Sequence, residues 1–224
     1  MVDKLGELAA KLDRAQARRS LGIDHDGPMV LLTPGSRRNE VAQQLSLQLE
    51  TARLLHEAHP ELRFALALAP SLDRGPLDAA RQAARLPDGL EIFVIESDSH
   101  RAIRAADVVL AKPGTITVEA ALLERPMVVM GRVHPLTAAI LRRVVKLSYL
   151  AMPNLIAGRQ IVPEFLQEDA EPRRIADAVG ELLAGPARDR QLAELAGVCD
   201  QLGGGGAARR ASLIAEEMLG AAPS

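Results

Sequence analysis

The stretch Met29-Val30-Leu31-Leu32-Thr33-Pro34-Gly35-Ser36 decides the fold of this chain. Its four consecutive apolar residues, 29–32, are typical of a strand that is buried on both faces of a sheet. The strand has to end at the Thr-Pro-Gly turn. A long amphipathic helix follows, with one apolar face made by Val41, Leu45, Leu49, Ala52 and Leu55. A buried strand followed directly by such a helix is the unit of α/β folds.

The same unit recurs along the chain. Further strands are predicted at 64–68, 90–95, 107–111 and 126–130, and helices at 76–86, 98–105, 115–123 and 135–147. A helix ending at Gly22 precedes the first strand, and three more helices are predicted at 172–184, 187–200 and 207–219. After residue 147 no strand signal remains, and 152–159 is too interrupted by Pro and Gly to be regular. We therefore predict a doubly wound, Rossmann-like parallel sheet with a C-terminal helical tail.

Composition narrows the class of protein. The 224 residues suit one large domain or two small ones. Lys and Arg number 27 against 29 Asp and Glu, so the charge gives no sign of nucleic-acid binding. The single cysteine, Cys199, excludes an internal disulfide framework and a multi-cysteine metal site. No apolar run approaches the ~18 residues of a membrane span and no signal peptide is recognisable, so we expect a cytoplasmic protein.

Two turns after predicted strands carry candidate ligand-binding residues, because ligands of open parallel sheets bind beyond the carboxyl ends of the strands. In the first turn, Gly35 permits close approach, Ser36 can cap the following helix, and Arg37 offers a bidentate cation for phosphate. In the later turn, Gly114 precedes Thr115, which can cap a helix or contact phosphate. Each turn also suits an ordinary helix cap, and two together favour a nucleotide diphosphate.

Other candidates are less specific. Glu119 lies one helical turn after Thr115 and shares a helix face with it. Its carboxylate can accept hydrogen bonds from two ribose hydroxyls, or it can be an ordinary surface carboxylate. Asn154 and Arg159 lie in the irregular segment after the last predicted strand. Residues 136–150 suit a basic amphipathic helix on an anionic membrane, although the residues favour a core helix with a solvated basic face. No histidine spacing indicates a metal site.

Together these motifs resemble the lipid-A-disaccharide synthase family of GT-B-type glycosyltransferases. The resemblance rests on Leu32–Arg37 with Glu40, Gly114-Thr115 with Glu119, and Pro126–Val129. It also rests on 153–159 (Pro-Asn-Leu-Ile-Ala-Gly-Arg, its most specific block) and 162–167 (Val-Pro-Glu-Phe-Leu-Gln). It runs from residue 2 to about 219 and covers the second half of the family's usual protein.

The resemblance implies a single nucleotide-sugar-binding domain over 1–224. It has a linker helix at 1–22, an α/β core at 28–170 and C-terminal helices at 171–224, with the acceptor domain absent. The family transfers 2,3-diacylglucosamine from its UDP conjugate onto 2,3-diacylglucosamine 1-phosphate and releases UDP. This half would bind the UDP part of the donor, without a metal cofactor, and the acid/base carboxylate would lie in the missing half. The implied partners are the acylated donor, a separate acceptor domain or subunit, and the inner face of the cell membrane.

The resemblance also implies a role for each candidate residue. Gly35, Ser36 and Arg37 would hold the diphosphate, with Arg37 stabilising the leaving group. Gly114 and Thr115 would pack against the phosphates and Glu119 would take the ribose. Asn154 and Arg159 would complete the nucleotide pocket.

One departure from the family pattern and two rival functions remain open. The family usually has Ser where this chain has Pro113, which lacks an N–H and a hydroxyl for phosphate. If the last helix crosses to a first domain, Leu213, Ile214 and Met218 should form an exposed apolar patch. The rivals are another UDP-sugar enzyme, such as a peptidoglycan glycosyltransferase or a UDP-N-acetylglucosamine epimerase, and a non-catalytic nucleotide-binding or interaction module. The block at 153–159 argues against the other enzymes.

Overall fold

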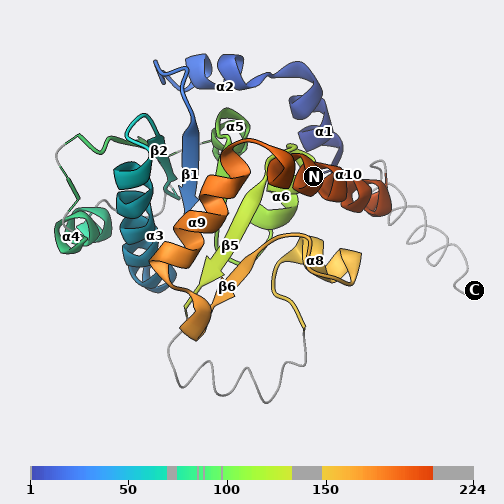
Figure 1. Cartoon of the computed structure of the whole chain (residues 1–224). Coiled ribbons are helices and arrows are strands. Elements are labelled where there is room, and N and C mark those ends of the chain that lie inside the picture. Colours follow the sequence, from blue (N-terminus) through green and yellow to red (C-terminus); the bar gives the residue numbers. More distant parts are fainter. Residues whose placement is uncertain are drawn as a thin grey trace, which may run out of the picture.

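The structure is a computed structural model that describes residues 2–69, 75–84, 86–87, 89–96, 98–132 and 148–203. Its centre is a parallel sheet in which the described strands follow the order β3-β2-β1-β4-β5-β6 (Figure 1). The strands are β1 Met29–Thr33, β2 Arg63–Ala67, β3 Ile92–Ile95, β4 Val108–Ala111, β5 Met127–Gly131 and β6 Glu164–Leu166. This is the order of a doubly wound fold, so that prediction is confirmed.

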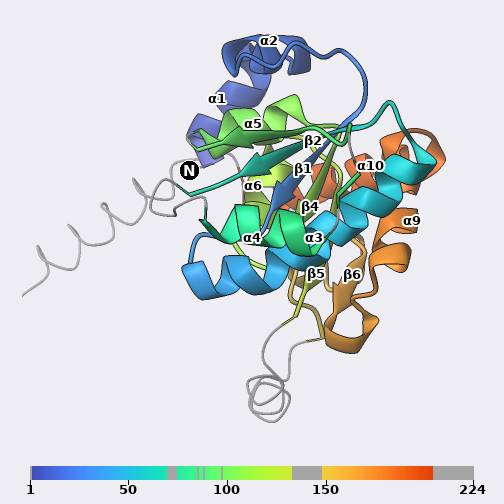
Figure 2. The same cartoon turned by 90° about the vertical axis from the view of Figure 1, so that its left-hand side faces the viewer.

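Helices cover both faces of the sheet. They are α1 Val2–Lys11, α2 Arg14–Ser20, α3 Arg38–Ala58, α4 Gly75–Ala83, α5 Ser99–Ala105, α6 Ile116–Leu122, α8 Met152–Ala157, α9 Pro172–Leu183 and α10 Pro186–Leu202, with the 3₁₀ helix η1 Gln167–Asp169. Figure 2 shows α3 and α9 on one side of the strands and α1, α2 and α5 on the other. The predicted helices at 135–147 and 207–219, and with them Leu213, Ile214 and Met218, lie outside the described residues.

Alternate residues of each strand supply the two halves of the core. In β1, Leu31 packs with Ala65 and Val109 in the cluster under α5 and α6. Its neighbours Val30 and Leu32 join the other cluster, under α3 and α9. Both sets are fully buried because side chains alternate along a strand and both faces are covered. The uninterrupted apolar runs in the sequence follow from this double burial.

The predicted linker helix at 1–22 is two helices that are tightly docked on the domain. Asp13 separates them with a capping box in which it accepts from the backbone N–H of Gln16. Arg104 of α5 donates to the carbonyls of Leu12 and Ala9 at 2.7 and 2.9 Å. Arg18 of α2 is buried and donates through Nε to the carbonyl of Ala105 at 3.0 Å. These buried guanidinium groups fix the first helices as part of the domain.

Arg18 also makes a buried ion pair at the amino ends of the central strands β1 and β4. Its Nη2 lies 2.9 Å from Oδ2 of Asp107, and both side chains are almost fully buried. The same carboxylate oxygen accepts from the backbone N–H of Met29 at 2.9 Å. The pair therefore ties α2 to the start of β1 and to the residue before β4.

Two predictions for the segment after residue 147 were wrong. Residues 152–157 form a helix, α8, in which Pro153 occupies the first turn, where its missing N–H costs nothing. The short strand β6 pairs with β5, with Phe165 opposite Met130, although three residues give no recognisable strand pattern. Beyond it, α9 packs on α3 and β5 and α10 packs on α6. The predicted tail, as far as residue 203, is thus part of the domain.

Candidate functional site

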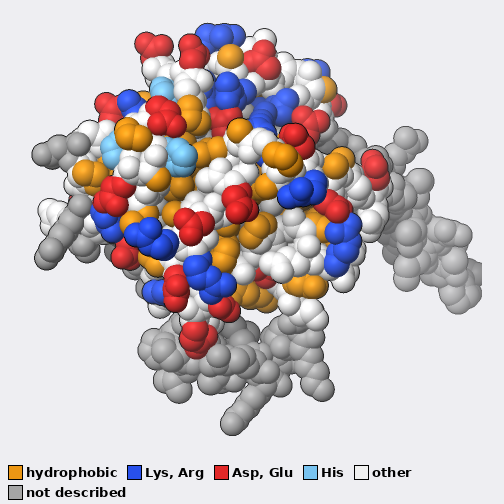
Figure 3. Space-filling model, viewed as in Figure 1, with side chains coloured by type: hydrophobic (Ala, Val, Ile, Leu, Met, Phe, Trp, Pro, Cys, Tyr) orange, Lys and Arg blue, Asp and Glu red, His pale blue; other side chains and the backbone are white. Residues whose placement is uncertain are grey.

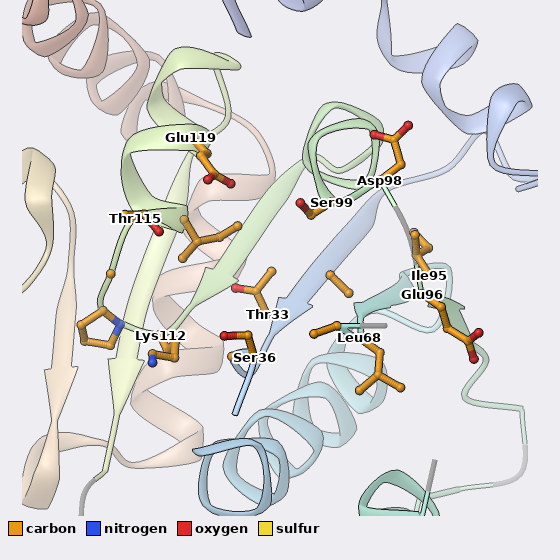
Figure 4. Close-up of a pocket in the computed structure, with 16 residues that line it drawn as sticks. Thr33, Ser36, Leu68, Ile95, Glu96, Asp98, Ser99, Lys112, Thr115 and Glu119 are labelled. Carbon is orange, nitrogen blue, oxygen red and sulfur yellow. The ribbon is translucent and has the colours of Figure 1, made fainter. Parts of the chain in front are cut away.

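A cavity of about 430 Å³ lies beyond the carboxyl ends of β1 to β4. We call it the switch-point cavity, because the order of the strands reverses between β1 and β4 and the sheet opens a crevice there. Figure 4 shows that its wall is built by the turns after these four strands. It is lined by Thr33, Gly35, Ser36, Ala67, Leu68, Ala69, Ile95, Glu96, Asp98, Ser99, Lys112, Pro113, Gly114, Thr115, Ile116 and Glu119.

The first wall is the turn between β1 and α3. Gly35 has a φ of +121°, which L side chains rarely adopt, so the turn requires glycine. Ser36 lines the cavity but does not cap the helix as predicted, because the N-cap is Arg37, which makes no capping bond through its side chain. The first N–H groups of α3 therefore lack a side-chain cap beside the cavity, an arrangement that favours an anion.

The second wall is the turn between β4 and α6. Gly114 has a φ of +147°, while a Cβ added there would meet nothing within 4 Å, so the backbone conformation alone demands glycine. Thr115 is the N-cap of α6, but its hydroxyl makes no capping hydrogen bond. Thr117 is buried, and its Oγ1 donates to the carbonyl of Gly114 at 2.7 Å. Of these two hydroxyls, only that of Thr115 belongs to the cavity wall.

Glu119 supplies a carboxylate one turn further along α6. Its side chain is 17% exposed, and Oε2 lies 3.6 Å from Nε2 of His100 on α5. Figure 4 shows Glu119 and Thr115 on the same side of the cavity. A carboxylate in this place can accept hydrogen bonds from two neighbouring hydroxyls, as ribose binding requires.

The cavity also contains residues that the sequence analysis did not choose. Lys112 directly follows β4, and Asp98 and Ser99 follow β3. Asp98 adopts a φ of 65° and caps α5, accepting from the backbone N–H of Arg101 at 3.1 Å. Their position after predicted strands was the available signal, since every such turn meets at the same edge of a parallel sheet.

Asn154, which the resemblance placed in the nucleotide pocket, lies outside the lining of this cavity. The side chain is fully buried, and its amide donates to the carbonyl of Val162 at 2.8 Å and to Oε1 of Glu164 at 2.7 Å. Its Oδ1 accepts from the backbone N–H groups of Ile161 and Val162, both at 2.8 Å. Because all of these bonds lie within the chain, Asn154 joins α8 to the strand β6 and has no bond to offer a ligand.

Arg159 and Arg37 also lie outside the cavity lining. Arg159 is 59% exposed and pairs with Glu194 of α10, whose carboxylate raises the pKa of the guanidinium. Arg37 is exposed and directly follows Ser36 of the wall, so a phosphate contact for it stays a prediction. Among the described residues, no group of His, Cys, Asp or Glu could hold a metal ion. None of the helices in that part of the chain is long and apolar enough to span a membrane.

Comparison with solved structures places the fold in a class. The C-terminal domain of a glycosyl transferase group 1 family protein (LpcC) from Francisella tularensis matches 84% of this chain and 90% of that chain, with a TM-score of 0.52 and 15% identity. A trehalose-6-phosphate protein of E. coli bound with UDP-2-fluoro glucose matches 90% of this chain and 46% of that one, with a TM-score of 0.58 and 13% identity. The fold is therefore that of a GT-B glycosyltransferase domain.

The sequence defines the family within that class. The family model of lipid-A-disaccharide synthetase matches residues 3–217, so the chain belongs to this family. The lipid-A-disaccharide synthase of Anaeromyxobacter dehalogenans is 40% identical over 204 residues, which are 91% of this chain and 52% of that protein. The chain thus spans about half the length of the curated relatives that it matches.

Proposed function

We propose that this chain is the donor-binding half of a hexosyltransferase of lipid A biosynthesis. Its switch-point cavity would bind the UDP part of a UDP-2,3-diacylglucosamine donor. The observation that carries the proposal is the convergence of two glycine-led turns and the Glu119 carboxylate on one cavity, in a chain of this family. The volume of about 430 Å³ falls within the usual range of small-molecule sites.

The proposal assigns a charge or a hydrogen bond to the diphosphate and to the ribose of the nucleotide. The uncapped start of α3, with Ser36, faces the diphosphate, and Thr115 donates its hydroxyl to the same group. Glu119 accepts from the two ribose hydroxyls. Arg37 closes over the phosphates as the donor binds, so protein cations and dipoles neutralise the diphosphate in place of a metal.

In the proposed reaction, the acceptor's 6-hydroxyl oxygen attacks C1 of the donor sugar and inverts it. The bond from C1 to the phosphate oxygen breaks, and UDP leaves with the electron pair. The hydroxyl proton goes to a base in the acceptor-binding half. The part played by this chain is to stabilise the charge that grows on the departing diphosphate, an electrostatic contribution to the transition state.

Calorimetric titration of the chain with UDP, and with GDP as the comparison, tests the proposed site. Glu119→Ala should weaken UDP binding ~10- to 100-fold, because a hydrogen bond to a charged group contributes ~1.5–3 kcal/mol. Glu61→Ala is the matched control, since Glu61 is exposed and precedes β2 at the opposite edge of the sheet. Equal UDP affinity of the two variants would refute the site.

Turnover assays separate the enzyme from a non-catalytic module. The chain should transfer no sugar alone, and should release UDP when it is mixed with the acceptor-binding half of a relative, an acylated donor and acceptor. UDP binding without transfer in that mixture would favour the module.

The family match argues against the peptidoglycan glycosyltransferase and the epimerase. An acylated donor also motivates our proposal of a cytoplasmic chain that contacts the inner membrane surface through residues 136–150.

A further inference from the structure

A second, larger cavity of about 810 Å³ lies between α1, α6 and α10. We call it the Arg125 cavity, after the arginine that enters its wall two residues before β5. Since the strands are parallel, this place is at the amino ends of the strands, whereas the switch-point cavity lies beyond their carboxyl ends. The two cavities share no lining residue. A ligand in the Arg125 cavity would therefore not compete with a nucleotide.

Arg125 is a buried cation with an unmet donor. Its side chain is 8% exposed, and among the described residues its Nε–H has no hydrogen-bond acceptor. Burial, followed by repulsion from Arg104 and Arg188, lowers the pKa of Arg125 to about 10. A buried guanidinium normally meets a carboxylate or a ring of carbonyls, because leaving its charge and N–H groups unpaired is costly.

The neighbouring arginine Arg104 already has its partners. It donates to two carbonyls of the N-terminal helices, to the carbonyl of Leu123 and to the carboxylate of Glu124, the last two at 3.1 Å. Glu124 belongs to the cavity wall, and its side chain is 69% exposed. The carboxylate of Glu124 is therefore exposed to solvent and paired with Arg104. It makes no hydrogen bond with Nε of Arg125.

The buried carboxylate near the cavity, that of Asp107, also has its partners within the chain. Asp107 accepts from Arg14, from Arg18 and from the backbone N–H of Met29. Arg188, which lines the cavity, lies 4.0 Å from this carboxylate and donates to the carbonyl of Leu183 at 3.0 Å. In this upper part of the molecule, near α2 and α10, Lys and Arg side chains lie among Asp and Glu side chains (Figure 3). The wall therefore holds three arginines, Arg104, Arg125 and Arg188, against the two carboxylates of Glu124 and Asp200, and neither carboxylate reaches Nε of Arg125.

Much of the remaining wall is apolar, and it also includes the exposed carboxylate of Asp200. Leu122 of α6 and Leu192 and Leu195 of α10 line the cavity together with Cys199. A volume of about 810 Å³ is that of a site for a whole small molecule rather than for a bare inorganic anion. The chemistry that fits a buried cation at one end and leucines along the wall is that of an amphipathic anion.

We propose that the Arg125 cavity binds an amphipathic phosphate or carboxylate. Its anionic head accepts from the guanidinium group of Arg125, Arg188 supplies a second cation, and its apolar part packs on the leucines of α6 and α10. Such a head can belong to a membrane lipid or to a soluble metabolite. Both sources share this chemistry, and different probes separate them.

Titration of the purified chain with octyl phosphate, in the presence of saturating UDP, tests the proposal. Octyl phosphate should bind and raise the melting temperature, and octyl glucoside, which has the same chain and no charge, should not. Arg125→Gln should weaken octyl phosphate binding at least tenfold. The matched control is Arg190→Gln on α10, which is exposed and outside the cavity lining. Equal binding by the wild type and Arg125→Gln would overturn the proposal.

A second variant keeps the test valid if Arg125→Gln folds poorly. Ala196 is exposed on α10 and lines the cavity, so Ala196→Glu should fold and should repel the anion. Its octyl phosphate affinity should also fall at least tenfold, and an unchanged affinity would count against the cavity as the binding site. Flotation with phosphatidylglycerol vesicles, compared with phosphatidylcholine vesicles, shows whether the anionic head belongs to a membrane lipid or to a soluble ligand. Binding that Arg125→Gln abolishes indicates a lipid headgroup, and octyl phosphate binding without flotation indicates a soluble ligand.

Discussion

The role of Asn154 gives the sharpest test of the structure. Asn154→Ala removes four hydrogen bonds of 2.7–2.8 Å inside the segment that joins α8 to β6. The site is fully buried, so water cannot replace the lost partners without entering the core. At about 1 kcal/mol net for each bond, we expect the free energy of unfolding to fall by ~3–5 kcal/mol. For a chain of this size that corresponds to a fall of ~6–20 °C in melting temperature.

Urea unfolding followed by circular dichroism measures this loss, because the chain has no Trp to serve as a fluorescent probe. Calorimetry with UDP, at a temperature where the variant is folded, measures the other half of the prediction. UDP affinity should be unchanged, since Asn154 makes its bonds within the chain and outside the cavity lining. Arg159→Ala is the matched control from the same sequence block, and because Arg159 is exposed we expect no measurable change in stability.

The opposite pattern would refute this reasoning. An Asn154→Ala variant that keeps its stability but loses UDP affinity would make Asn154 a ligand contact, as the family resemblance implied. A loss below 1 kcal/mol would show that the four bonds do not hold α8 and β6 together.

Three further predictions follow from other parts of the structure. Asp107→Ala leaves the buried Arg18 without its carboxylate, so the free energy of unfolding in urea should fall by ~3–5 kcal/mol, and a fall below 1 would contradict the buried network. Gly114→Ala forces a φ of +147° on an L residue and should cost ~1–3 kcal/mol, while Gly6→Ala within α1 should be neutral or stabilising in the same melts. Burial lowers the pKa of Arg125 from its ordinary value to about 10, so the unfolded chain binds this proton more tightly and burial of the charge costs up to ~3 kcal/mol at pH 7. Arg125→Met should therefore raise stability at pH 7, and the rise in wild-type stability above pH ~10 should disappear in this variant; lower stability of the variant at pH 7 would contradict the uncompensated charge.

The sequence determined the doubly wound sheet and the place of the switch-point cavity. The runs at 29–32 and 107–111 read as buried strands because both faces of the sheet are covered, and local hydrophobicity records that double burial. Gly35 and Gly114 marked the two turns because their φ values demand glycine. These features are local, so a single chain is enough to reveal them.

Only the tertiary structure decided which candidates meet. Asn154 and Arg159 belong to the most specific motif, yet they bond to residues 161–164 and to α10, which the sequence cannot place beside them. The strand β6 forms because the edge of β5 is available for pairing, and its three residues carry no strand signal of their own. The unmet Nε–H of Arg125 likewise depends on burial in the folded chain, which the sequence does not report. Composition reports how many charges a chain has, but their pairing depends on distances across the fold, where Coulomb energies fall with separation and rise with burial.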